Sequence, residues 1–229
     1  MERKLSGTVF SRVGSIMLVT VLLMLSLTGC GADERDNQLA LLKSENEALK
    51  ERVELLENSV EPQQTSLLGA AVDVMTLIAN QDFVSLSTYV HPSQGVRFSP
   101  YAYVDVENHL KFNAQDVADL LLDTTMHTWG AYDGSGFPIE LSFADYYTRF
   151  VYDQEFVNPH LVGLNRVIGF GNTLVNINDV HPNGSFIEFH FTGFDPQYEG
   201  MDWRSLFLVF EQLDGNWYLV GIVHNEWTI

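Results

Sequence analysis

The sequence predicts a protein of the α+β class, in which an N-terminal helix precedes a globular domain with helices first and an antiparallel sheet after them. Two observations lead to this prediction. Apolar residues recur at helical spacing through residues 67–78 and 113–128, and the last third of the chain contains runs rich in Val, Ile, Phe, Tyr and Trp. Because the helical segments precede the strands instead of alternating with them, a doubly wound α/β sheet is disfavoured.

Residues 1–29 predict a secretory signal peptide. Three basic residues and one acidic residue lie within positions 1–12, and residues 13–27 are almost wholly apolar. This order of a charged and an apolar segment is typical of a secretory signal. The apolar run of about 15 residues is shorter than the roughly 20 that span a bilayer as a helix.

The signal ends in Leu27-Thr28-Gly29-Cys30, which resembles the lipobox of bacterial lipoproteins. In that family the cysteine sulfur receives a diacylglyceryl group, the peptide is cut before it, and the cysteine becomes the new N-terminus. The resemblance implies a lipidated Cys30, a tether over residues 30–38 and an extracytoplasmic position on the cell membrane. The alternative is an incidental cysteine after an ordinary signal anchor. Since Cys30 is the only cysteine, its lipidation would leave none for a disulfide, a Cys-zinc site or a thiol nucleophile.

Residues 39–60 predict a coiled coil, followed by a linker over residues 61–66. Apolar residues recur in a heptad pattern that a single asparagine interrupts. The d positions hold Leu42, Leu49 and Leu56, and the a positions hold Leu39, Asn46, Val53 and Val60. A lone polar residue at an a position favours two strands in one register, so the segment predicts a parallel homodimer. A single amphipathic helix docked on the domain is the alternative.

Residues 67–229 are rich in aromatic residues and are expected to form one domain. Asn113 and Ser142 are the expected N-caps of helices over 113–128 and 143–152, and residues 95–106 are expected to be extended around Pro100. Asp214-Gly215 is a strong signal for a β-hairpin. Strands are expected over residues 172–180, 185–192, 205–212 and 216–227.

This order of helices and strands resembles the NTF2-like or cystatin-like superfold. Three strings are also similar to an uncharacterised group of lipoproteins from Gram-positive bacteria. They are Tyr89-Val90-His91-Pro92, residues 95–101 and the Gly-x-Trp-Tyr-Leu-Val-Gly pattern of residues 215–221. The resemblance covers residues 72–229 and implies a conical sheet that often cups a ligand. It brings no catalytic residues, and NTF2-like folds serve enzymes, binding modules and dimerisation modules alike.

The chain is strongly acidic, with 12 Lys and Arg residues against 30 Asp and Glu residues and a formal net charge of −18. After position 65 there are five basic and 20 acidic residues. A surface of this sign repels nucleic acid and anionic headgroups, so nucleic-acid binding is not expected. Cationic ligands, metal ions or a basic partner fit better, although acidity also keeps a secreted domain in solution.

Five polar residues on the predicted strands are candidates for one pocket. Glu188 and His190 are two residues apart and share a strand face, and Tyr218, His224 and Glu226 are expected to share a face of the last strand. If both sets point inward they would line one pocket, where His and Glu suit acid–base chemistry or metal ligation. The alternative is that they face solvent while the neighbouring apolar residues form the core.

Arg97 is a further candidate, because it is one of the five basic residues of an acidic domain. It could bind an anionic group or pair with Asp105 or another acid. No Gly-x-Ser-x-Gly elbow, His-Glu-x-x-His motif, phosphate-binding loop or EF-hand spacing is present in the sequence. No metal, cofactor or catalytic residue is therefore assigned.

Together these patterns predict an extracytoplasmic lipoprotein that presents a binding or interaction domain at the cell envelope. The expected partners are the membrane, through Cys30, a second copy of the chain, through residues 39–60, and an unidentified ligand or protein. One alternative is a small-molecule hydrolase or isomerase that uses the pocket His and Glu residues. The other is a structural spacer of the envelope.

Overall fold

The computed structural model describes residues 32–59 and 66–228, with side chains placed for residues 35–53 and 66–228. The chain divides into two compact units, Met1–Glu61 and Pro62–Ile229, and each is described by itself. The predicted signal peptide, Cys30 and most of the predicted linker lie outside the described residues. None of the helices that the structure describes combines the length and the apolar character that crossing a membrane requires.

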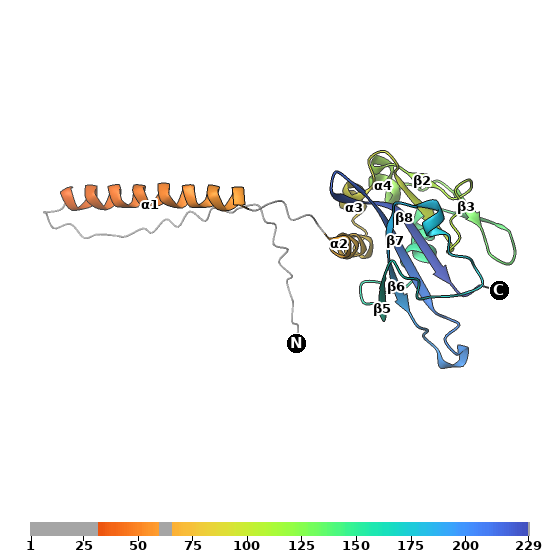
Figure 1. The fold of residues 1–229 in the computed structure, drawn as a ribbon. Helices are drawn as coiled ribbons and strands as arrows, with labels where there is room; N and C mark the ends of the chain where they lie inside the picture. The colour runs from red at the N-terminus through yellow and green to blue at the C-terminus, as the bar shows by residue number, and fades with distance from the viewer. Residues whose placement is uncertain (1–31, 60–65, 229) are drawn as a thin grey trace, which may run out of the picture. The chain divides into compact units, whose positions relative to one another are not determined.

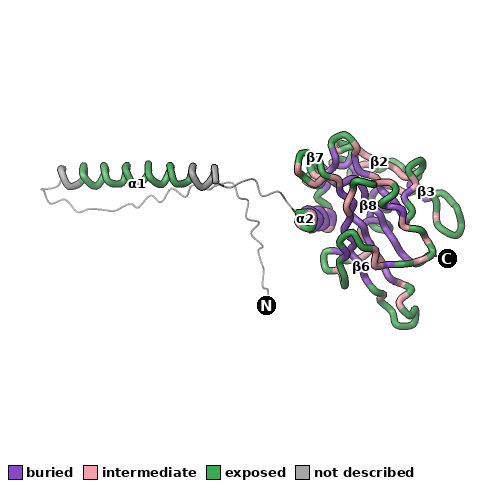
Figure 2. Tube along the Cα trace, in the orientation of Figure 1, coloured by how far each residue is buried: buried purple, intermediate pink, exposed green. Residues whose placement is uncertain are grey.

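Helix α1 (Ala32–Ser59) is the described part of the first unit (Figure 1). It begins at Ala32, so most of the segment predicted as a tether is helical. The predicted seam is open to solvent along the single helix, as Figure 2 shows by the exposed colour of its tube. The exposed fractions are 53% for Leu39, 58% for Leu42, 55% for Leu49 and 49% for Val53. The helix is confirmed, and its pairing with a second copy stays a prediction.

The second unit contains a six-stranded sheet and a separate hairpin. The sheet order is β2-β1-β8-β7-β6-β5, and the hairpin pairs β3 with β4. The sheet strands are β1 (Val96–Ser99), β2 (Lys111–Phe112), β5 (Leu161–Leu164), β6 (Ser185–Phe191), β7 (Arg204–Leu213) and β8 (Asn216–Glu226), and the hairpin strands are β3 (His127–Ala131) and β4 (Pro138–Leu141). All pairs are antiparallel except β1 with β8, which run parallel.

Short helices fill the connections before and between the strands. They are α2 (Leu67–Ala79), α3 (Phe83–Leu86), η1 (Ser87–Tyr89), α4 (Ala114–Asp119), η2 (Leu120–Leu122), α5 (Phe143–Tyr146), η3 (Tyr147–Val151), α6 (Ile177–Val180) and η4 (Pro196–Tyr198). Asn113 caps α4 and Ser142 caps α5, as the sequence predicts, because each side chain accepts a bond from a backbone N–H in the first turn.

The inner strands β1, β8, β7 and β6 are largely buried on both faces of the sheet, as their purple stretches in Figure 2 show. We call one the helix face, because α2, α3, α4, α5, η3 and the β3–β4 hairpin pack on it through the larger core cluster, which includes Phe98, Phe150 and Leu208. We call the other the loop face, where Val104 and residues of the 167–180 segment cover Phe207 and Val209. Strands that are apolar on both sides, as β7 is, need this double cover.

A β-bulge in β8 changes which residues lie on each face. Val209 pairs with Gly221 and Phe210 pairs with Leu219, so Val220 is an extra residue in β8. An extra residue reverses the alternation of side chains beyond it. Leu219 and Ile222, three positions apart, therefore both lie on the helix face.

The predicted α+β class and the strands corresponding to β6, β7 and β8 are confirmed. Asp214 and Gly215 form the predicted hairpin, with φ of 50° and 80° as a type I′ turn requires. The strand predicted over 172–180 is wrong, because that segment contains α6 and covers the loop face. The helix predicted over 113–128 ends at Leu122, and β3 begins at His127. The sequence predicted a wholly antiparallel sheet, and this is wrong for one pair, because β1 and β8 run parallel.

Candidate functional site

The five residues predicted to line one pocket are divided between the two faces of the sheet. His190 pairs with Ser205 and His224 pairs with Leu206, one position along β7, so the two imidazoles lie on opposite faces. The bulge at Val220 also separates Tyr218 from His224 and Glu226. The single-pocket prediction is therefore wrong. The alternative, that these residues face solvent, is also wrong for Glu188, His190, His224 and Glu226, which are buried.

Burial is nevertheless nearly complete for four of these five side chains. Glu188 and His224 are 0% exposed, His190 is 5% exposed and Glu226 is 6% exposed. Polar groups that deep in a protein must be hydrogen-bonded or paired to avoid a large desolvation cost. Each face of the sheet holds a polar cluster that pairs these groups, although His224 Nε2 on the helix face has no hydrogen-bond partner.

On the loop face, Glu188 holds the segment that covers the sheet. Its carboxylate accepts bonds from the backbone N–H groups of Ile168, at 2.5 Å, and Gly169, at 2.9 Å. The Ser205 hydroxyl donates to the same carboxylate at 2.6 Å and lies 2.8 Å from His190 Nδ1. Burial raises the pKa of Glu188 more than these bonds lower it, and burial lowers the pKa of His190.

On the helix face, a charged network joins the end of β8 to the chain that follows η3. Arg204 Nε lies 3.1 Å from both Asp153 Oδ2 and Glu226 Oε2, and Arg149 also pairs with Glu226. His224 Nε2 is 3.3 Å from Asp153 Oδ2 but lacks hydrogen-bond geometry. Burial raises the pKa of Asp153, but His224, Arg204 and Arg149 together lower it below its usual value.

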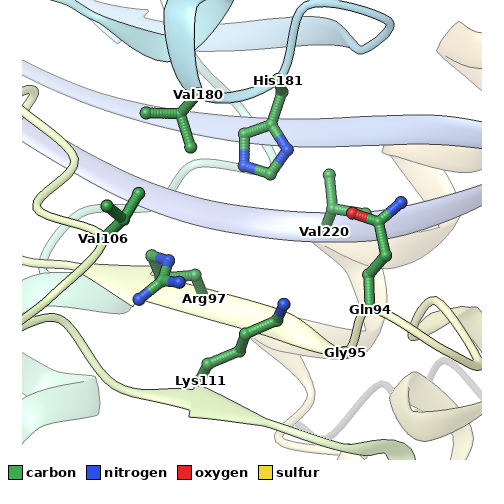
Figure 3. A pocket seen from close by; sticks show the side chains of 8 residues that line it. All are labelled: Gln94, Gly95, Arg97, Val106, Lys111, Val180, His181 and Val220. Atoms are coloured by element: carbon green, nitrogen blue, oxygen red, sulfur yellow. The ribbon is translucent and has the colours of Figure 1, made fainter.

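A pocket of about 160 Å³ opens on the loop face at the other end of the sheet (Figure 3). Its walls come from β1, β2, β8, the end of α6 and the turn before β1. The lining residues are Gln94, Gly95, Arg97, Val106, Lys111, Val180, His181 and Val220. This volume is below the roughly 300–1,000 Å³ of sites for drug-sized ligands, so the pocket suits a small molecule or a single chemical group.

Arg97 is thus the one predicted candidate that lines this pocket. Its guanidinium donates to the backbone carbonyl of His109 at 2.5 Å. Burial lowers the pKa of Arg97, and Asp105 opposes that shift from a distance. Among the described residues no carboxylate lies within the 4.0 Å ion-pair distance of Arg97, so the predicted direct pair with Asp105 is absent.

Three other polar groups of the pocket were not predicted as site residues. Lys111 faces Arg97 across the β1–β2 pair, and His181 and Gln94 share Glu211 as a partner. His181 Nδ1 lies 3.1 Å from Glu211 Oε1, and Gln94 donates to Glu211 Oε2 at 2.6 Å. The scarcity of cations in the domain is the signal that pointed to Arg97, and the same signal applies to Lys111.

The fold and the pocket define the class of the protein. It is a mixed α+β domain with a small cationic pocket on one face of its sheet. Within the described residues, no group of three or more His, Cys, Asp or Glu side chains is arranged to hold a metal ion. No family model matches the chain, and no curated protein matches it.

Among solved structures, a chain described as a calcium/calmodulin dependent protein kinase II association domain from Xanthomonas campestris is similar to this one. The two have 10% sequence identity, the match covers 67% of this chain and 80% of the other, and the TM-score is 0.29. A likeness at this level assigns neither a family nor an activity to the chain.

Proposed function

We propose that the chain is an extracytoplasmic lipoprotein, anchored to the cell membrane by a lipidated Cys30, whose domain is a binding module. The single observation behind the anchor is the ordered sequence of a basic segment, an apolar segment and Leu27-Thr28-Gly29-Cys30. Two acyl chains anchor a protein stably, whereas one chain binds only marginally. The described helices fit this proposal because they add no membrane span.

We further propose that α1 is a paired stalk. It has 28 residues, which corresponds to about 42 Å at 1.5 Å per residue. Its exposed seam of Leu39, Leu42, Leu49 and Val53 would be covered by a second copy in a parallel dimer. Anchoring both copies to one membrane raises their effective concentration and therefore favours pairing.

For the domain, an NTF2-like architecture remains part of the proposal, supported by a mostly antiparallel sheet that helices cover on one face. A binding role fits the structure better than catalysis. The enzyme alternative required His190 and His224 in one pocket, and they lie on opposite faces of the sheet. Each is instead held in a polar cluster that secures the fold.

Mass spectrometry of the mature N-terminus tests the anchor. We expect a diacylglyceryl group on Cys30 in the natural chain, and uncleaved precursor or released protein in Cys30→Ser. The matched control is Ser26→Ala, which lies before the lipobox and should leave the lipid in place. An unmodified Cys30, or cleavage at another bond, would contradict the lipoprotein proposal.

Sedimentation of the Cys30→Ser chain at high concentration tests the stalk. We expect a dimer that dissociates on dilution, and Asn46→Leu should strengthen association while loosening its stoichiometry, because it removes the polar residue that selects two strands. Asn37→Leu is the matched control, since the heptad pattern places Asn37 away from the seam. A monomer at every concentration would refute the stalk.

A further inference from the structure

The cations of the pocket lack the carboxylate partners that Arg149 and Arg204 have. Arg149 and Arg204 both pair with Glu226, whereas neither Arg97 nor Lys111 has a carboxylate within 4.0 Å among the described residues. The two also lie directly opposite one another in the antiparallel β1–β2 pair. Like charges in that position destabilise a strand pair, and an anion between them would relieve the repulsion.

Two other polar side chains lie at the same hollow as the two cations. The side chains of Arg97, Lys111, His181 and Gln94 come from different elements and line one hollow (Figure 3). Glu211 Oε1 lies 3.1 Å from His181 Nδ1, which leaves Nε2 as the ring nitrogen available to the hollow. His181 itself is fixed at the end of α6, where its backbone N–H donates to Ile177 O at 2.8 Å.

We propose that this pocket binds a small oxyanion, a sulfate, phosphate or carboxylate group, between the Arg97 guanidinium, the Lys111 ammonium and His181 Nε2. Guanidinium and ammonium groups are the usual ligands of such anions, and charge-assisted bonds of this kind are about twice as strong as neutral ones. The pocket volume of about 160 Å³ admits one such group and excludes a large ligand. The site deepens the binding role proposed above but depends on neither the lipid nor the dimer.

Binding at this site is linked to proton uptake by His181. The groups that face its ring are Glu211 from β7, Arg97 from β1 and Lys111 from β2. Burial lowers the pKa of His181, Glu211 raises it, and the two cations lower it further. His181 is therefore neutral near pH 7, with Nε2 as an acceptor. A bound anion stabilises the protonated ring, so the affinity should rise as the pH falls.

Isothermal titration of the whole chain in a non-ionic detergent, with sodium sulfate as the probe, tests the site. Sulfate keeps its charge between about pH 5 and pH 8, so any pH dependence belongs to the protein. We expect Lys111→Gln to weaken sulfate binding about tenfold or more. Arg166→Gln is the matched control, since it removes the same charge from an exposed position elsewhere and should leave affinity within about twofold. His181→Gln should keep some binding and lose its pH dependence.

Three results would overturn the proposal. They are no heat of binding at millimolar sulfate, equal weakening by Lys111→Gln and Arg166→Gln, and an affinity that rises with pH. Acetate and phosphate, titrated in the same way, distinguish a carboxylate ligand from a tetrahedral one. Failure of these titrations would leave the lipid anchor untouched, and loss of the anchor would leave the titrations interpretable.

Discussion

Replacing Glu188 tests how the loop face is held. In the native domain its carboxylate accepts the backbone N–H groups of Ile168 and Gly169 and the hydroxyl of Ser205. Glu188→Ala removes all three acceptor contacts. The hydroxyl can turn to His190, which lies 2.8 Å away, but the two N–H groups keep no acceptor at this position.

The magnitude follows from those two N–H groups. Each buried donor left without a partner costs about 1–3 kcal/mol, and removing a buried carboxylate returns part of that cost. We therefore expect Glu188→Ala to lower the free energy of unfolding by about 3 kcal/mol. For a domain of this size that is roughly 6–12 °C in Tm. Glu188→Gln keeps one carbonyl acceptor and should fall between wild type and alanine.

Urea denaturation followed by tryptophan fluorescence measures the effect. Glu140→Ala, on an exposed position of β4, is the control and should stay within about 0.5 kcal/mol of wild type. The variant Glu188→Ala should also become more readily cleaved by protease within residues 166–180, because that segment loses one of its attachments to the sheet. A wild-type midpoint in Glu188→Ala would refute the argument that this carboxylate holds the loop.

Further predictions concern the hairpin, the helix-face network and one close contact. Gly215→Val should lower stability by about 1 kcal/mol or more, because φ of 80° is strained for a branched residue; an unchanged urea midpoint would argue against it. The pKa of Asp153 is lowered in the folded state, so its contribution is present above the usual carboxyl pKa and lost as the pH falls. Asp153→Asn should therefore flatten the drop in Tm between about pH 5 and pH 3, and an unaltered drop would exclude Asp153 as its source. Gly169→Ala should destabilise the domain, since an added Cβ would lie 2.6 Å from the Trp203 ring; a wild-type Tm would show that the ring moves aside.

Local signals in the sequence predicted the elements that depend on only a few neighbouring residues. The caps at Asn113 and Ser142 and the turn at Asp214-Gly215 depend on one side chain or one φ angle, and each is confirmed. Strands β6, β7 and β8 follow from continuous β-rich runs. The segment 172–180 also contains Thr, Val and Ile, although four of its nine residues are Asn or Asp. It covers the sheet instead of joining it, and burial against the loop face needs apolar residues in any conformation.

Features that depend on how strands far apart in the sequence pair with one another could not be predicted from the local sequence pattern. Alternation within β6 correctly placed Glu188 and His190 on one face, but only the register with β7 shows that His224 lies on the other. The bulge at Val220 has no turn residue of its own to announce it, although Gly221 follows. The cationic pocket combines β1, β2 and the end of α6, which are up to 84 positions apart in the chain from Arg97 to His181, so proximity along the sequence gave no sign of it.

The place of β8 in the sheet has a consequence for the order in which the domain can fold. Among the strands that the structure describes this one comes last in the sequence, yet it lies between β1 and β7 and pairs with both. Until it emerges from the ribosome, the two halves of the sheet have no shared neighbour, and the backbone groups of β1 and β7 on that side lack partners. The sheet is therefore completed only after β8 has been made, so a shortened chain that stops at Leu213 has lost the middle of its sheet and not an edge.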